Sequence, residues 1–341
     1  MTIFLRLWNK LMKLEFLSIF LLSLLIILIG TVFIHVLEPE DFPTYFEGFW
    51  WTMTTLTTVG YGDYSPTTVS GRLLGIFLFV FGIGLIGVLI GKIVDAFTSY
   101  SKLKTEGKLM YKKENHYIYI GWSNRTKKTI MEVLTYDPDV EIVLIDDLPK
   151  TPIEHHKVHF IQGDPSDEEV LLKANILKAK RVAIFADTRI NNPLLADGKS
   201  LLIASAVEAL SEKHGQNIHT VVEVCEEKHI PKFKHIQIDD FILSNDSISL
   251  LMAKATLHPG TTGLFRQLLS KTYGSNIHEL HPKKEWKTYE EAYQSLFEHG
   301  AVLVSVNDKM DFAQTPKHPL TENDLLYIVC KDEVFNAISS K

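Results

Sequence analysis

The chain has 341 residues, which is the length of two or three ordinary domains. Its 46% hydrophobic and 22% charged residues exclude general disorder, and its net charge of −6 argues against a broadly basic nucleic-acid-binding protein. Only two cysteines occur, Cys225 and Cys330, so a disulfide framework is excluded as well.

Two long apolar segments without formal charge lie near the N-terminus, at residues 16–37 and 73–91. Each helical residue adds about 1.5 Å, so both segments can cross a hydrocarbon core of about 30 Å. A cleavable signal peptide is the alternative for the first segment, because Arg6, Lys10 and Lys13 precede it. That segment is longer than a usual signal core and no small-residue cleavage site follows it, which favours two membrane helices.

The charges around these segments predict their orientation. Residues 38–71 contain five acidic side chains and neither Lys nor Arg, whereas residues 92–113 contain six lysines. By the positive-inside rule, the acidic connection faces outward and both termini are cytoplasmic. We therefore expect a multi-pass protein of the cell membrane, with the lipid bilayer as a partner and no role for nucleic acid.

The acidic connection contains a segment that is unusual for a loop. Residues 43–56 are apolar and aromatic, but they are too few to span a bilayer, so we expect a short re-entrant helix that is buried in protein. The sequence TTVGYGD follows at residues 57–63. Gly60 and Gly62 permit backbone conformations that other residues avoid, so successive carbonyl groups can point the same way. Rings of such carbonyl oxygens can replace the hydration shell of K⁺.

This segment resembles the potassium-channel signature. The resemblance implies a selectivity filter at Thr58, Val59, Gly60, Tyr61, Gly62 and Asp63, with K⁺ as the permeant ion. It also implies a homotetramer, because one chain contributes one filter loop. In similar channels the inner helix bends at a glycine about one helix length past the filter, which corresponds to Gly82 here. Close packing of this glycine against a neighbouring helix is the alternative.

From about residue 115 the pattern changes to that of a soluble α/β protein. Five short apolar runs alternate with amphipathic segments, which predicts a parallel sheet built from βαβ units; the runs are residues 117–120, 141–145, 159–162, 182–186 and 220–224. The first turn keeps only Gly121 of the glycine pattern typical of dinucleotide-binding folds, and Ser123 and Thr126 replace the other two glycines. Asp146 ends the second expected strand, where a ribose could bind, so Gly121, Ser123 and Asp146 are the candidate cofactor-binding residues. No His, Lys or Tyr stands at a matching catalytic position, and we expect no enzyme.

The combination resembles a prokaryotic two-helix potassium channel with a C-terminal RCK domain of the TrkA-N and TrkA-C type. The expected fold is an α-helical membrane pore with two spans and a pore helix, followed by a Rossmann-like α/β RCK domain and a small α+β subdomain. The boundaries we expect are 1–98 for the pore, 99–114 for a linker, 115–244 for the Rossmann-like part and 245–341 for the C-terminal subdomain. The resemblance implies a cytoplasmic gating ring, which can include additional RCK copies.

The regulatory ligand stays open between several classes. In calcium-gated relatives, carboxylates near the ends of the fourth and fifth strands bind the ion, and Asp187 and Glu223 correspond to them. Clustered carboxylates suit Ca²⁺, but Cys225 stands where those relatives have another carboxylate. Solvated strand ends, a nucleotide at the Gly121 turn, and a nucleotide second messenger in the C-terminal subdomain are the alternatives.

We therefore expect a ligand-gated, potassium-selective channel whose tetrameric TVGYG filter is controlled by a cytoplasmic RCK ring. The alternative is a membrane-tethered nucleotide-binding enzyme, or a regulatory subunit, with a non-conducting pore.

Overall fold

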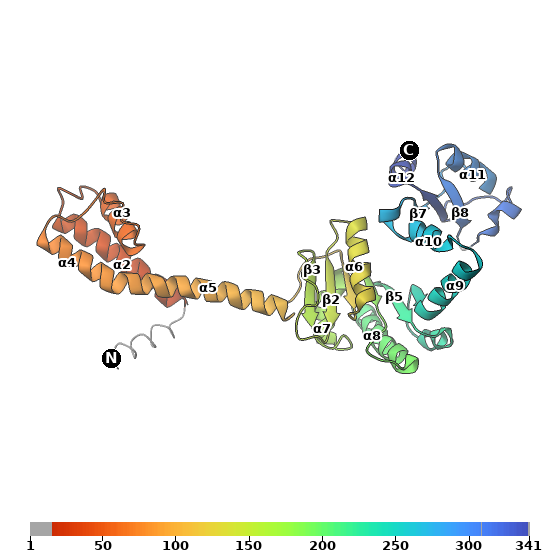
Figure 1. Ribbon diagram of the computed structural model, residues 1–341, viewed down its shortest axis with the longest axis horizontal. Helices are drawn as coiled ribbons and strands as arrows, with labels where there is room; N and C mark the ends of the chain where they lie inside the picture. The colour runs from red at the N-terminus through yellow and green to blue at the C-terminus, as the bar shows by residue number, and fades with distance from the viewer. Residues whose placement is uncertain (1–15, 308, 340–341) are drawn as a thin grey trace. The chain divides into compact units, whose positions relative to one another are not determined.

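The computed structural model describes residues 16–307 and 309–339. The chain forms two compact units, the first ending at Leu103 and the second beginning at Lys104 (Figure 1). The fold class expected from the sequence is confirmed: apolar helices come first, then a parallel sheet with helices, then a small antiparallel sheet. Arg6, Lys10 and Lys13 lie outside the described residues, and the orientation of the termini stays a prediction.

The first unit contains two helical stretches that are long and apolar enough to cross a membrane, Phe16–Leu37 and Val69–Thr105. Helix α2 is the first of them, and the second consists of α4 (Val69–Phe77), a π-helical turn η1 (Leu78–Gly82) and α5 (Ile83–Thr105). The second stretch extends beyond the predicted segment 73–91 at both ends. Large side chains of α2 such as Phe20, Leu24 and Leu28 are exposed, which suits contact with lipid.

A short helix, α3 (Tyr45–Leu56), lies between the two long stretches, as expected for a re-entrant segment. It begins at a capping box, in which the Glu47 carboxylate accepts a hydrogen bond of 2.7 Å from the Thr44 backbone N–H. Its inner face packs into a small apolar core with α2 and η1, made of Ile34, Phe42, Trp51, Leu56 and Leu78. This core positions the loop that follows α3.

The second unit begins with a six-stranded parallel sheet of order β3-β2-β1-β4-β5-β6, which is a Rossmann-like arrangement. Its strands are β1 (His116–Ile120), β2 (Ile142–Asp146), β3 (Val158–Gln162), β4 (Ala179–Ile184), β5 (His219–Val224) and β6 (Asp240–Leu243). Its helices are α6 (Asn124–Tyr136), α7 (Glu168–Lys173) and α8 (Pro193–His214), with short 3₁₀ turns at η2 (Ile176–Lys178) and η3 (Glu227–Phe233). The five strands expected from the sequence are present, and β6 is a sixth strand that the sequence analysis did not predict.

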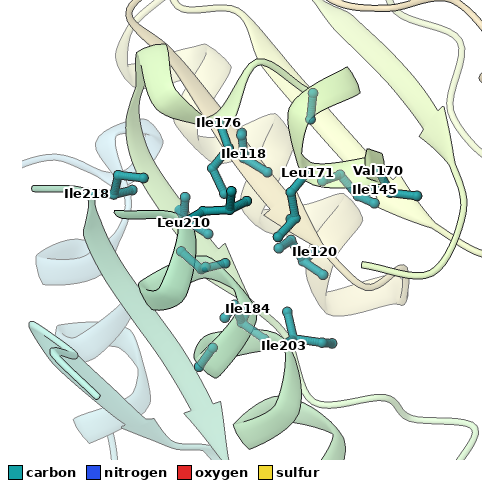
Figure 2. Close-up of a cluster of buried hydrophobic side chains, with 14 of the residues drawn as sticks. Ile118, Ile120, Ile145, Val170, Leu171, Ile176, Ile184, Ile203, Leu210 and Ile218 are labelled. Carbon is teal, nitrogen blue, oxygen red and sulfur yellow. The ribbon is translucent and has the colours of Figure 1, made fainter. Parts of the chain in front are cut away.

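Each face of the sheet carries its own apolar core. Because successive side chains of a strand point to opposite faces, Ile118 and Ile120 pack with α7 and α8, whereas Tyr119 packs with α6. Figure 2 shows the first core, in which Ile184 of β4 lies beside Ile203 of α8. Both faces are therefore covered, and the ends of the strands remain as the places where polar groups gather.

The rest of the chain forms the smaller α+β part. Helices α9 (Ser244–Leu257) and α10 (Thr261–Leu269) lead to a three-stranded antiparallel sheet of order β7-β9-β8. The strands are β7 (Asn276–Leu280), β8 (Val302–Val306) and β9 (Leu326–Cys330), and they pack with α11 (Tyr289–Glu298) and α12 (Asp332–Ser339). Cys330 lies buried in this core, as expected for a small apolar thiol.

Candidate functional site

The loop after α3 has an alternating backbone. Thr58, Gly60 and Gly62 have φ values of 60°, 54° and 77°, so every second residue lies in the left-handed region. The backbone N–H groups of Val59 and Gly60 both donate to the Thr54 carbonyl, at 2.9 and 3.1 Å, which attaches the loop to the end of α3. Alternation of this kind lets successive carbonyl groups face one side, the arrangement needed to replace the hydration shell of a cation.

Of the three residues with left-handed backbone, Thr58 is the one whose conformation costs free energy. A left-handed conformation costs a residue with a Cβ atom roughly 1–2 kcal/mol, whereas glycine adopts it freely. Strain of this size at a non-glycine residue is typical of functional sites whose surroundings enforce the conformation. The position therefore supports Thr58 as part of the functional loop.

Trp50 of α3 holds the second half of the loop, at Tyr61 and Asp63. Its indole N–H donates to the Asp63 carboxylate at 2.8 Å, and its ring stacks on the Tyr61 ring with 5.6 Å between the centroids and 3° between the planes. The sequence analysis did not single out Trp50. The paired tryptophans 13 and 12 residues before Asp63 were the available signal, because a residue of the pore helix must support the loop that follows it.

A buried carboxylate fastens the connection between the two long helical stretches. Glu38 is 3% exposed and accepts hydrogen bonds from the backbone N–H groups of Thr67 and Thr68, both at 2.9 Å, and from the Thr68 hydroxyl at 2.5 Å. Burial alone would raise the pKa of Glu38, but the bonds from Thr68 and Thr67 outweigh it and leave the pKa below its ordinary value. Glu38 thereby joins the end of α2 to the residues that precede α4.

Gly82 is a close-packing position in this structure. It lies in the π-helical turn η1, and a Cβ atom added to it would overlap the Leu56 side chain at the end of α3. The packing alternative for this glycine is therefore present in the structure. A bend at Gly82 during gating stays a prediction, although π-helical turns often occur at functional positions.

The candidate nucleotide residues lie together at the carboxyl edge of the sheet. Gly121 has a φ of 93°, and an added Cβ would lie 3.0 Å from the Phe185 carbonyl oxygen. The Ser123 hydroxyl caps α6 by accepting from the Thr126 N–H at 3.2 Å, and the Trp122 N–H donates to the Asp146 carboxylate at 2.7 Å. Two of the N–H groups at this turn, those of Trp122 and Thr126, are thus bonded to side chains of the chain itself and not available to a phosphate.

Two cations fill the space beside Asp146. The Arg189 guanidinium lies 2.6 Å from Asp147, 2.9 Å from Asp187 and 3.6 Å from Asp146, and the Lys199 ammonium lies 2.8 Å from Asp187. The hydrogen bonds from Arg189 and Lys199 hold the pKa of Asp187 well below its ordinary value despite its burial. Burial raises the pKa of Asp146 in spite of the bond from Trp122. The cavity left among these groups is only about 20 Å³.

Glu223 has a different arginine as its partner. It is 6% exposed, its carboxylate lies 2.5 Å from the Arg125 guanidinium, and it accepts a hydrogen bond of 3.0 Å from the Ala186 N–H. The structure thus brings Asp187 and Glu223 to the same edge of the sheet but pairs each with a cation. Among residues 16–307 and 309–339, no group of three or more His, Cys, Asp or Glu side chains is arranged to hold a metal ion.

Cys225 lies just beyond this edge. Its N–H donates to the buried Asp197 carboxylate at 2.7 Å, and burial together with Asp197 raises the pKa of the thiol to about 11. A protonated thiol is a poor ligand for Ca²⁺, which prefers oxygen. The sequence analysis missed Arg125, Arg189 and Asp197, because residues that pair across different loops leave no local pattern.

Comparisons with known proteins agree with the two units. Residues 21–99 match the ion channel family, and residues 117–244 match the TrkA-N domain family. YugO of Bacillus subtilis, which has been assigned as a potassium channel protein, is 29% identical over 320 residues, 92% of either chain. The calcium-gated potassium channel TvoK of Thermoplasma volcanium is 29% identical over 262 residues, 75% of this chain and 73% of TvoK.

A solved structure shares the fold of much of the chain. The human SLO3 gating ring matches with a TM-score of 0.50 at 13% sequence identity, over 65% of this chain and 45% of that chain. At this identity the likeness concerns the fold alone.

Proposed function

Because the chain joins an ion-channel domain to a TrkA-N domain and is homologous to prokaryotic potassium channels, we propose that it conducts K⁺ selectively under the control of its cytoplasmic domain. The relatives are channels rather than enzymes. The observation that carries the proposal is the alternating left-handed backbone at Thr58, Gly60 and Gly62, within TTVGYGD and between two apolar helices. Residues 58–63 are the proposed filter, with the Thr58 hydroxyl at its inner end and Asp63 at its outer mouth.

We propose that four chains surround one pore. A filter needs loops from four sides, and one chain supplies a single loop. The Tyr61 side chain is 68% exposed and the Val59 side chain 54% exposed, so much of the loop is left uncovered by the chain that carries it. Neighbouring copies would cover these side chains, while the exposed apolar face of α2 contacts lipid.

The cytoplasmic domains are proposed to associate into a gating ring, with either four or eight copies. Helices α9 and α10 support association, because they form an apolar groove of about 610 Å³. The exposed apolar side chains along it are Ile248, Leu250, Leu257, Phe265 and Leu269. A surface of this kind on a domain that meets identical copies fits a partner of the same chain.

The regulatory ligand is proposed to act where Arg189 and Lys199 meet Asp187. TvoK is calcium-gated, and Ca²⁺ would have to displace both cations from this carboxylate before binding it with Glu223. A nucleotide would instead bind the two cations through its phosphates and release the carboxylates. Replacing Arg189 by Gln separates the two cases. It should lower the Ca²⁺ concentration that is needed for a response if Ca²⁺ is the ligand, and raise the nucleotide concentration that is needed for a response if a nucleotide is the ligand.

Recording from the purified protein in planar bilayers tests the proposed function. We expect an ohmic K⁺ current with strong rejection of Na⁺, and a response of the open probability to Ca²⁺, ATP, ADP, NAD(H) or a cyclic dinucleotide. The alternative function, a membrane-tethered nucleotide-binding protein with a non-conducting pore, would give no current. Protease added to one side of sealed vesicles would test whether both termini are cytoplasmic.

A further inference from the structure

The segment between α5 and β1 is bound to the Rossmann-like domain along its length. Helix α5 ends at Thr105, and Glu106 is the single residue between this end and the next attachment, at Gly107. Four backbone hydrogen bonds hold the segment: Thr151 N–H to Thr105 carbonyl at 2.8 Å, Gln162 N–H to Gly107 carbonyl at 3.0 Å, Tyr111 N–H to Lys173 carbonyl at 2.9 Å, and Asn115 N–H to Lys178 carbonyl at 2.9 Å. A free tether would make none of these bonds.

Gly107 makes the first attachment possible. Its φ is 65°, and a Cβ atom added there would overlap the backbone nitrogen of Gln162 and crowd the Phe160 ring at 2.8 Å. The chain therefore turns against the edge strand β3 at a distance that only glycine permits. A side chain at position 107 would force the segment and β3 apart, so the close approach depends on this glycine.

Tyr111 makes the deepest contact of the segment. Its side chain is 7% exposed, and its ring lies between His116 and His159, with centroid distances of 4.5 and 5.4 Å. Its hydroxyl donates to the Glu141 carboxylate at 2.8 Å. Burial and this bond raise the pKa of the phenol, so it keeps the proton that it donates. His159 adds a second attachment, because its Nε2 lies 2.8 Å from the Leu109 carbonyl oxygen.

We propose that Tyr111 is a positioning residue for gating. Tyr111 binds the segment to the domain, so that a displacement of the edge strand β3 also displaces the end of α5. The inference rests on the proposed function, because it concerns how the cytoplasmic domain controls the pore. A segment bound in this way differs from a flexible linker, in which the residues between α5 and the sheet would change conformation and the displacement would not reach the helix.

A protease experiment on the full-length protein tests the attachment. Replacing Tyr111 by Phe removes only the hydroxyl and its bond to a carboxylate, and a bond of this class corresponds to a change of about tenfold in local opening. Trypsin should therefore cut after Lys108 or Lys112 about tenfold faster in Tyr111→Phe than in the wild type. Tyr293→Phe is the control, because Tyr293 is a half-exposed tyrosine of α11. Trypsin should cut this variant after the same lysines at the wild-type rate. Equal rates in Tyr111→Phe and wild type would overturn the attachment.

Single-channel recording tests the role in gating. Tyr111→Phe should change the open probability at least threefold and Tyr111→Ala more, in the same direction, while unitary conductance and K⁺ over Na⁺ selectivity stay at wild-type values. Faster cleavage with an unchanged open probability would overturn the positioning role. An absence of K⁺ current in the wild type would instead overturn the proposed function, and the trypsin rates would still decide the attachment, so the two failures are distinguishable.

Discussion

Replacing Glu38 by Gln should destabilise the connection that frames the proposed filter. One carboxylate oxygen of Glu38 accepts a hydrogen bond from the Thr67 N–H, and the other accepts hydrogen bonds from both the N–H and the hydroxyl of Thr68. A glutamine keeps one oxygen and places an NH₂ group against the remaining donors, which leaves buried polar groups unpaired. Each such group costs about 1–3 kcal/mol, and the lost charge-assisted bonds add to it, so we expect a loss of roughly 2–4 kcal/mol.

Thermal unfolding of the purified protein in detergent at pH 7 measures this loss. A destabilisation of that size should lower the unfolding midpoint by roughly 5–15 °C. Glu40→Gln is the matched control, since Glu40 is exposed on the same connection and should change the midpoint by at most a degree or two. An unchanged midpoint in Glu38→Gln would refute the reasoning that this carboxylate fastens the connection.

The pH dependence gives a second check on Glu38. Its pKa in the folded protein is below the ordinary value of 4.5. Its contribution to stability is therefore fully present above pH 4.5 and is lost as the pH falls through the lower folded-state value. The difference between wild type and Glu38→Gln should stay constant from pH 7 down to about 5 and then shrink. A difference that grows on acidification would contradict the assigned hydrogen bonds.

Three further outcomes are expected. Gly62→Ala should abolish selectivity for K⁺ over Na⁺ in bilayer recordings without preventing membrane insertion, because alanine disfavours a φ of 77°; full selectivity in this variant would remove the basis of the filter assignment. Gly82→Ala should lower the unfolding midpoint through overlap with Leu56, and the same substitution should lower it less in a Leu56→Ala background if packing is the cause. If Ca²⁺ activates the channel, Asp187→Asn and Glu223→Gln should each shift activation to a higher Ca²⁺ concentration at constant unitary conductance. A Ca²⁺ response that is unchanged in both variants would exclude these carboxylates as ligands of the ion.

The sequence by itself determined the features that depend on local pattern. Uncharged segments long enough to cross a bilayer identify the two spans, because a helix in lipid must satisfy its own backbone and exclude charge. The glycines of TTVGYGD indicate the unusual backbone of the proposed filter loop, since few other residues tolerate it. Alternating apolar runs predicted five of the strands, whereas the short, half-exposed edge strand β6, whose apolar run is only Phe241–Leu243, was missed.

Only the tertiary structure decided which charged and polar groups meet. Asp187 and Glu223 are adjacent to strand ends in the sequence, but their pairing with Arg189 and Arg125 depends on how the parallel strands bring separate loops to one edge. The docking of Tyr111 onto Glu141 likewise joins residues 30 positions apart. Such contacts depend on the energies of burial and hydrogen bonding in the assembled fold, and no periodic signal along the chain records them. For this reason the residues of the proposed filter, and Asp187 and Glu223, could be named from the sequence, whereas Arg189, Lys199 and Tyr111 required the fold.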